Sequence, residues 1–162
     1  MSPETSGRSL VILSSTHHRN TEKVARVIAE VLGAEIAKPQ DVDPAELQTH
    51  ALTGFGSGIY GAKHHETVLE LANRLPLVTD KRAFIFSTSA IINKSKIASD
   101  HATLRGILES KGYAIADEFS CRGFNTNSFM KYLGGMNRGR PNAKDLERAR
   151  AFAQRLQRQM ES

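Results

Sequence analysis

The sequence predicts an α/β fold in which a parallel sheet of five strands is covered by helices on both faces. Short runs of branched apolar residues alternate along the 162 residues with segments of helical periodicity. This pattern is typical of parallel strands joined by helical crossovers. A chain of this length with 40% hydrophobic residues can bury one sizeable core but is too short for two ordinary domains. We therefore expect a single domain over 9–160, preceded by a disordered N-terminal tail over 1–8.

The first half of the chain provides three of the predicted strands. The first strand, Ser9–Leu13, leads into a helix that Gly33 stops. The apolar residues of this helix recur at spacings of three and four: Val24, Val27, Ile28, Val31 and Leu32. Glu35–Ala37 is a weak second strand, and Ala51–Phe55 is the third. The exit of the third strand, Gly56-Ser57-Gly58, is so rich in glycine that we predict a loop there.

The second half continues the alternation. Pro76 closes a helix, and the fully apolar run Ala83–Phe86 follows it as a central strand covered on both faces. A less regular helix ends before Gly112, and Ala114–Cys121 alternates well enough for a fifth strand. Pro141-Asn142 then offers a cap for a last helix. The three helical stripes are Val68, Leu71, Ala72 and Leu75, then Ile97, Leu104, Ile107 and Leu108, and finally Leu146, Ala149, Ala153, Leu156 and Met160.

Composition excludes several classes of protein. The net charge of +5 lies entirely in the last 32 residues, which hold eight Lys and Arg against three acidic residues. This basic helix face is either a solvated surface or a docking face for an acidic redox partner. Nucleic-acid binding is not expected, because aromatic interleaving and reader motifs are missing. No run approaches the roughly 18 apolar residues of a membrane span, so we expect a cytoplasmic protein.

The single cysteine, Cys121, also fits a reducing compartment. It lacks a C-x-x-C partner and the spacing of a phosphatase loop. We therefore interpret Cys121 as a partly buried structural thiol rather than a nucleophile.

The loop from Ser14 to Glu22 carries the strongest chemical signal. It reads Ser-Ser-Thr-His-His-Arg-Asn-Thr-Glu and leads directly into the first helix. Hydroxyls, an amide and the free N–H groups of a helix start can hold a phosphate without a metal. The glycine patterns of triphosphate and dinucleotide sites are absent, which makes those ligands less expected. The alternative is that the polar residues only cap the helix.

This loop resembles the phosphate loop of the flavodoxin family. Gly54–Tyr60 is similar to the family's second flavin loop, and Phe119–Phe124 and Gly134–Pro141 are similar to one flavodoxin-like branch. The resemblance implies a flavodoxin-like three-layer sandwich with a five-stranded parallel sheet in the order 2-1-3-4-5. It also implies noncovalent binding of flavin mononucleotide (FMN).

The resemblance implies which residues hold the flavin. Ser15, Thr16, Asn20 and Thr21 would hold the phosphate, with His17, His18 and Arg19 in the same loop. The second and third loops would add Ser57, Gly58, Ile59, Tyr60 and Gly61, then Ser87, Thr88 and Ser89. Arg19 stands where flavodoxins usually place a glycine, and it either adds positive charge or crowds the turn. The third loop lacks the tyrosine that many flavodoxins stack on the flavin ring.

The histidine pairs are interpreted separately. His17-His18 and His64-His65 lack the i, i+4 spacing of a helical zinc site, so we expect no metal. Lys63 and His64 follow Tyr60-Gly61, where a positive or hydrogen-bonding group could stabilise a reduced flavin. A solvated start to the next helix is an equally good interpretation.

Three functions remain open from the sequence. The first is an FMN-binding electron carrier that serves redox partner proteins as a monomer or weak dimer and needs no catalytic residue. The second is an FMN-dependent oxidoreductase acting on a quinone, a porphyrinogen or NAD(P)H. The third is a flavin-free descendant of the fold.

Overall fold

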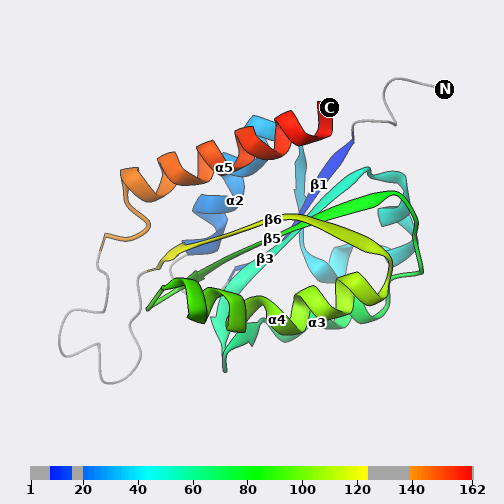
Figure 1. Ribbon diagram of the computed structural model, residues 1–162, viewed down its shortest axis with the longest axis horizontal. Coiled ribbons are helices and arrows are strands. Elements are labelled where there is room, and N and C mark those ends of the chain that lie inside the picture. Colours follow the sequence, from blue (N-terminus) through cyan, green and yellow to red (C-terminus); the bar gives the residue numbers. More distant parts are fainter. Residues whose placement is uncertain (1–7, 16–19, 124–138, 162) are drawn as a thin grey trace.

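The computed structural model describes residues 8–15, 20–123 and 139–161, and its five parallel strands form one sheet (Figure 1). The strand order is β2-β1-β3-β5-β6. These strands are β1 (Ser9–Ser14), β2 (Glu35–Ala37), β3 (Leu52–Tyr60), β5 (Lys81–Ser89) and β6 (Tyr113–Arg122). A short sixth strand, β4 (Lys63–His64), pairs antiparallel with β3. The parallel sheet is as predicted, but β4 was not expected and changes the numbering from 2-1-3-4-5 to 2-1-3-5-6.

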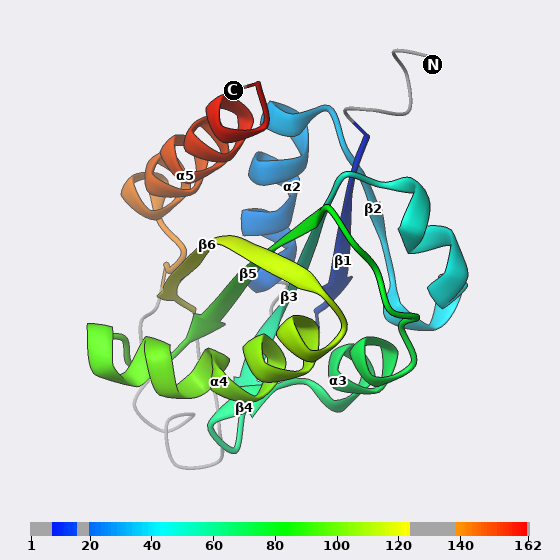
Figure 2. The same cartoon turned by 45° about the vertical axis from the view of Figure 1, so that its right-hand side comes forward.

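Helices cover both faces of the sheet (Figure 2). One face is covered by α2 (Asn20–Leu32) and α5 (Ala143–Glu161). The other is covered by α3 (Glu66–Asn73) and α4 (Lys94–Ser110). Two short 3₁₀ helices, η2 (Pro39–Asp41) and η3 (Pro44–Thr49), connect β2 to β3. Among the described residues, no helix combines the length and apolar character needed to cross a membrane.

The sheet divides the core into two apolar layers. The layer under α2 and α5 contains Val11, Phe84, Phe86 and Phe152. The layer under α3 and α4 contains Phe55, Ile85 and Leu104, among others. Consecutive residues of β5 therefore point to opposite faces, and each face meets apolar helix residues. This explains why the run Ala83–Phe86 is apolar without interruption.

The predicted loop at Gly56-Ser57-Gly58 is wrong, because these residues lie inside β3. The glycines have a packing role there. A Cβ atom added to Gly54 would lie 2.1 Å from the Phe84 ring, and one added to Gly56 would lie 2.2 Å from the Phe86 ring. The two rings occupy the space that side chains on β3 would otherwise fill. Glycine here therefore indicates close approach of an aromatic ring rather than a turn.

We expect Gly56→Ala to lower the free energy of unfolding by about 2 kcal/mol, because the new methyl group would overpack the buried Phe86 ring. Gly106→Ala is the matched control, because Gly106 lies within α4 with no atom near its would-be Cβ. That control should instead stabilise the protein by up to about 1 kcal/mol through helix propensity. Urea denaturation monitored by circular dichroism measures both changes. A neutral Gly56→Ala variant would contradict the packing role.

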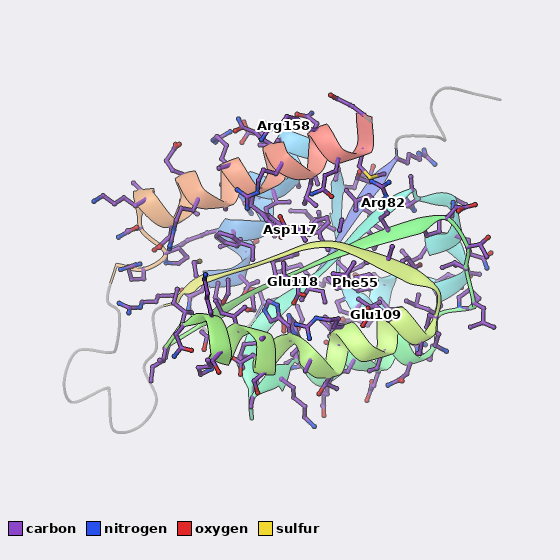
Figure 3. All side chains as sticks on the ribbon, viewed as in Figure 1. Phe55, Arg82, Glu109, Asp117, Glu118 and Arg158 are labelled. Carbon is purple, nitrogen blue, oxygen red and sulfur yellow. The ribbon has the colours of Figure 1, made fainter. Side chains whose placement is uncertain are left out.

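A register shift in β6 decides which of two adjacent acidic residues faces α4 and which faces α5. Ala83 pairs with Ile115 but Phe84 pairs with Asp117, so one residue of β6 is bulged. Asp117 then faces Arg155 of α5, whereas Glu118 faces Arg105 of α4. Figure 3 shows the two carboxylates on either side of β6. The bulge thus places the Glu118 carboxylate, rather than that of Asp117, on the α4 side of the sheet.

Candidate functional site

The carboxyl ends of the parallel strands meet at one edge of the sheet, where ligands bind in folds of this type. Near this edge, Ser14, Ser57, Ser87 and Ser120 occupy neighbouring register positions on four strands. We call these four residues the serine row. Their side chains point to the face under α3 and α4, two residues beyond Phe55 and Ile85 on the same face. The apolar layer therefore ends in a band of hydroxyls.

The first half of the predicted phosphate loop is only partly described. Thr16, His17, His18 and Arg19 lie outside the described residues, but Ser15 and the start of α2 flank them. The Ser15 Oγ atom is buried and has no hydrogen-bond partner among the described residues. A polar atom in that situation is costly unless something else bonds it. This is the feature of the edge that points most directly to a bound polar group.

The start of α2 is fixed against two other strands. Asn20 and Thr21 are both buried at the first turn of α2. The Thr21 and Thr88 hydroxyls are hydrogen-bonded at 2.8 Å, which joins α2 to β5. A Cβ atom added to Gly123 would lie 2.8 Å from the Asn20 amide nitrogen, so the end of β6 packs directly on Asn20. The helix terminus that the sequence assigns to a phosphate is therefore held in place from two sides.

The hairpin between β3 and β4 presents an aromatic ring. Gly61 and Ala62 both have positive φ, 58° and 62°, as a two-residue turn between antiparallel strands requires. Tyr60 is 38% exposed, and its ring meets that of His65 edge-on at 5.3 Å. The His65 backbone N–H donates to Ser57 Oγ at 2.9 Å. The turn thus holds Tyr60 at the surface with Ser57, Gly58 and Ile59 leading up to it.

The third predicted loop is also wrong in its secondary structure. Ser87, Thr88 and Ser89 continue β5 as a strand. Ser87 and Thr88 are buried, and their hydroxyls are bonded to other side chains of the protein. Ser89 is half-buried and accepts a hydrogen bond from Lys96 Nζ. Ser87 and Thr88 therefore lie in the interior behind the edge, where they bond other side chains. Ser89, the last residue of β5, lies closest to the edge.

His64 is buried rather than part of a solvated helix start, so that interpretation of its sequence position is wrong. It is buried in β4, and its Nε2–H donates to the Phe86 carbonyl at 2.9 Å. Burial, and after it the nearby His101 ring 5.0 Å away, lower the pKa of His64 to about 3. His64 is therefore neutral at physiological pH.

Two other sequence interpretations can be compared with the structure. No group of three His, Cys, Asp or Glu that could hold a metal ion occurs within the described part of the chain. Cys121 is fully buried, and burial raises the pKa of its thiol to about 12. A thiol that stays protonated is a poor nucleophile, and Cys121 is fully rather than partly buried. The sequence analysis missed His101 and Glu118, because neither belongs to a recognisable motif. His101 lies behind the edge and is hydrogen-bonded to both Ser87 and Glu118.

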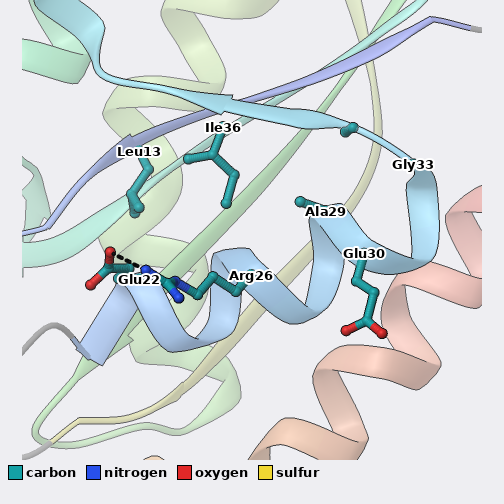
Figure 4. A pocket seen from close by; sticks show the side chains of 8 residues that line it. Leu13, Glu22, Arg26, Ala29, Glu30, Gly33 and Ile36 are labelled. Carbon is teal, nitrogen blue, oxygen red and sulfur yellow. Dashed lines mark hydrogen bonds and ion pairs between the residues drawn. The ribbon is translucent and has the colours of Figure 1, made fainter.

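Two hollows lie beside the edge. A groove of about 610 Å³ follows the β3–β4 hairpin and is lined by Tyr60, Lys63, His65 and Leu69. A second groove, of about 600 Å³, separates α2 from the edge strand β2 (Figure 4). Leu13 and Ile36 form its apolar wall, and the Glu22–Arg26 ion pair borders it. The first groove reaches Tyr60 and so adjoins the candidate site.

Comparison with known proteins identifies relatives in sequence and in structure. No family model matches the chain. The uncharacterized protein MJ0298 of Methanocaldococcus jannaschii is 40% identical over 150 residues, covering 92% of this chain and 97% of that protein. Flavodoxin 2 from Bacillus cereus superposes with a TM-score of 0.70 at 14% identity, covering 94% of this chain and 99% of the other.

Two further solved structures have the same fold. The flavodoxin of Fusobacterium nucleatum, solved with bound FMN, has a TM-score of 0.64 at 12% identity, covering 94% and 98% of the two chains. An NADH:FMN oxidoreductase in its apo form has a TM-score of 0.60 at 19% identity, covering 93% and 89%. Identities this low indicate a shared fold only. The chain thus belongs to the same family as the archaeal protein MJ0298, and its fold is flavodoxin-like.

Proposed function

We propose that this protein binds FMN noncovalently at the carboxyl edge of its sheet and transfers electrons through it. The observation that carries the proposal is the buried Ser15 Oγ, which lacks a hydrogen-bond partner among the described residues at the junction of β1 and α2. A phosphate oxygen would accept a hydrogen bond from the Ser15 hydroxyl, and the N-terminus of α2 favours negative charge. The flavodoxin-like fold agrees with this placement.

The residues present fit a flavin in three places. Ser15, Thr16, Asn20 and Thr21 would hold the phosphate, and His17, His18 and Arg19 would surround it. The hairpin would contact the ring through Ser57, Gly58, Ile59, Tyr60 and Gly61. Ser89 would approach the opposite side, with Ser87 and Thr88 bracing it from inside. The flavin would supply the electron-accepting chemistry, while the protein orients it and sets its surroundings.

Tyr60 is the residue that would cover the flavin ring. Its exposed aromatic side chain is held at the edge by a tight turn, so it can lie against a flat ligand without reorganising. An aromatic cover excludes water from a ring that gains negative charge, and this makes the reduced state less favourable. Tyr60 would thereby adjust the potential without taking part in a chemical step.

The basic face of α5 would receive the redox partner. Lys144, Arg148, Arg155 and Arg158 are exposed and lie on one side of this helix, at separations of four, seven and three residues. Their positive charge would attract an acidic electron-transfer protein to a cytoplasmic monomer or weak dimer. Electron-transfer rates that do not change with ionic strength would contradict this role.

FMN titration of the flavin-free protein tests the site first. We expect quenching of FMN fluorescence at micromolar concentration, and at least tenfold weaker binding in Thr16→Ala and Asn20→Ala, because each substitution removes a polar group from the phosphate loop. Cys121→Ala is the control, because Cys121 is buried in the apolar core and is not part of the phosphate loop. Equal losses in all three variants would show that the phosphate loop is misassigned. No binding by the wild type would favour a flavin-free role.

An FMN-dependent oxidoreductase acting on a quinone, a porphyrinogen or NAD(P)H is the second candidate. The observation that favours it is the short connection from β5 to α4, where Ala90, Ile91, Ile92 and Asn93 include no aromatic residue and Ile91 is exposed. One side of the flavin ring would then be open to a substrate. Rapid oxidation of NAD(P)H without a partner protein would support this candidate. A one-electron-reduced flavin that persists under anaerobic photoreduction would support the carrier instead.

A further inference from the structure

A buried hydrogen-bonded chain runs from the serine row into α4. Ser120 Oγ lies 2.9 Å from Ser87 Oγ, which lies 2.7 Å from Nε2 of His101. The other ring nitrogen of His101, Nδ1, lies 2.9 Å from Glu118 Oε1. Arg105 then holds both carboxylate oxygens of Glu118, with each N–O distance 2.8 Å. We call this set, from Ser120 to Arg105, the serine–histidine chain.

The proton positions at one end of the chain are fixed by chemistry. Burial alone would raise the pKa of Glu118, but hydrogen bonds from His101 and Arg105 outweigh burial and lower the pKa to about 2. Glu118 is therefore a carboxylate, which can only accept hydrogen bonds. His101 must then carry a proton on Nδ1. The atom of the imidazole whose protonation can change is Nε2, which faces Ser87.

The other end of the chain can accommodate either state of Nε2. Ser87 donates to Ser120 in the structure, which is the arrangement in which Nε2 carries a proton and donates to Ser87. When Nε2 is bare, the Ser87 hydroxyl turns its hydrogen to Nε2 instead, and Ser87 can then accept from Ser120. Rotation of hydroxyl hydrogens is what would let this chain pass a proton.

A hydrolytic role does not fit this geometry, although serine, histidine and a carboxylate stand in the order of a catalytic triad. The side chain of Ser87 is only 1% exposed, so a substrate could not reach its hydroxyl. His101 is completely buried as well. The chain can conduct and store a proton, but it cannot attack a bound molecule.

Charged and titratable groups face His101 from β6, β4 and α4. Glu118 faces it from β6 as a carboxylate, already shared with Arg105 of α4. His64 faces it from β4 and is neutral, because burial lowers its pKa to about 3. On α4, Lys96 and Asp100 are paired with each other. Ser87 is two residues from Ser89 at the end of β5, a distance of about 7 Å along a strand.

We propose that His101 is a redox-linked proton store, which gains a proton on Nε2 when an electron reaches the flavin at the adjacent edge and loses it when the electron leaves. The electron comes from a redox partner protein and the proton from water, through half-buried Ser120 and then Ser87. One N–H bond forms on reduction, and the same bond breaks on oxidation. This inference rests on the proposed flavin, because the electron's negative charge is what retains the proton.

The test has two parts, and the first uses flavin-free protein. Nitrogen-15 NMR of the histidine rings at neutral pH should show His101 with a proton on Nδ1. In the second part, the midpoint potential of the FMN-loaded protein is measured from pH 5.5 to 8.5 in the wild type, His101→Gln, Glu118→Gln and His50→Gln. His50 is the control, because it is half-buried at the end of η3 and outside the chain.

The equilibrium constant for reduction of the flavin should fall as the pH rises from 5.5 to 8.5. We expect this fall to be about tenfold larger in the wild type than in His101→Gln. A tenfold change is of the order expected for two unit charges that interact within a protein at an effective dielectric constant of about 20. His50→Gln should follow the wild type. Glu118→Gln should move the pH-dependent part to lower pH, and it remains informative if His101→Gln does not fold.

The outcomes separate this inference from the proposed function. Normal FMN binding with identical pH profiles in the wild type and His101→Gln would overturn the proton store and leave the flavin site standing. A proton on Nε2 and none on Nδ1 in flavin-free protein would overturn it without any flavin measurement. Failure of the wild type to bind FMN would remove the proposed function, and the proton store with it.

Discussion

Asp145→Ala should lower the free energy of unfolding by about 3 kcal/mol, because this substitution removes a buried carboxylate that several groups share. The Asp145 side chain is 1% exposed. Arg140 donates to both of its oxygens, Arg148 donates at 2.7 Å, and the backbone N–H of Asn142 donates at 2.8 Å. Burial alone would raise the pKa of Asp145, but these hydrogen bonds outweigh burial and keep the pKa below its ordinary value.

The same carboxylate also starts α5. Asn142 Oδ1 accepts from the Asp145 N–H at 2.9 Å, so the two residues cap each other reciprocally. Glu147→Ala is the matched control, because Glu147 is an exposed acid two residues further along the same helix. Chemical denaturation should show a change within about 0.5 kcal/mol for this control. If the two variants lost similar amounts of unfolding free energy, Asp145 would contribute only its negative charge and not its specific hydrogen bonds.

The periodicity of apolar residues predicted the fold well, because the sheet is apolar on both faces and each helix is apolar on one face. The stripe from Val24 to Leu32 became α2, and Ala83–Phe86 became the middle of β5. The cap predicted at Pro141-Asn142 was also correct, since Asn142 precedes α5. Each of these signals is local, and local signals survive folding when packing agrees with them.

The two wrong loop predictions have one physical cause: contacts with residues far away in the sequence determine the structure at these positions. Gly56 suggested a loop, but its role depends on the Phe86 ring, thirty residues later. Ser87 resembled a loop residue, yet it is buried because His101 and Ser120 bond its hydroxyl. Packing of this kind cannot be predicted from residue type and spacing alone.

The candidate site was predicted in part, by resemblance rather than by geometry. The register of the strands does bring Ser57 and Thr88 to one edge with the start of α2. The inner layer behind that edge was not predicted, because His101 lies in the middle of a helix and Glu118 reaches it only through the bulge in β6. The sequence therefore predicted which strand ends meet at this edge, but not the buried groups behind them.

His64→Gln should remove much of the acid sensitivity of the protein. Burial lowers the pKa of His64 to about 3, whereas in the unfolded chain it is near 6.5. Below pH 6.5 the unfolded chain therefore binds a proton that the folded protein does not, and this favours unfolding. The wild type should lose about 2 kcal/mol from this residue between pH 7 and pH 5, and about 3 kcal/mol by pH 4.

The measurement is the free energy of unfolding in urea at pH 7, 6, 5 and 4. His64→Gln can still donate to the Phe86 carbonyl, and its stability should depend less on pH even if it is lower at pH 7. His50→Gln is the control: burial also lowers the pKa of His50, but this residue is half-buried and should change the profile less. Parallel profiles for the wild type and His64→Gln would mean that the pKa of His64 is the same in the folded and the unfolded protein.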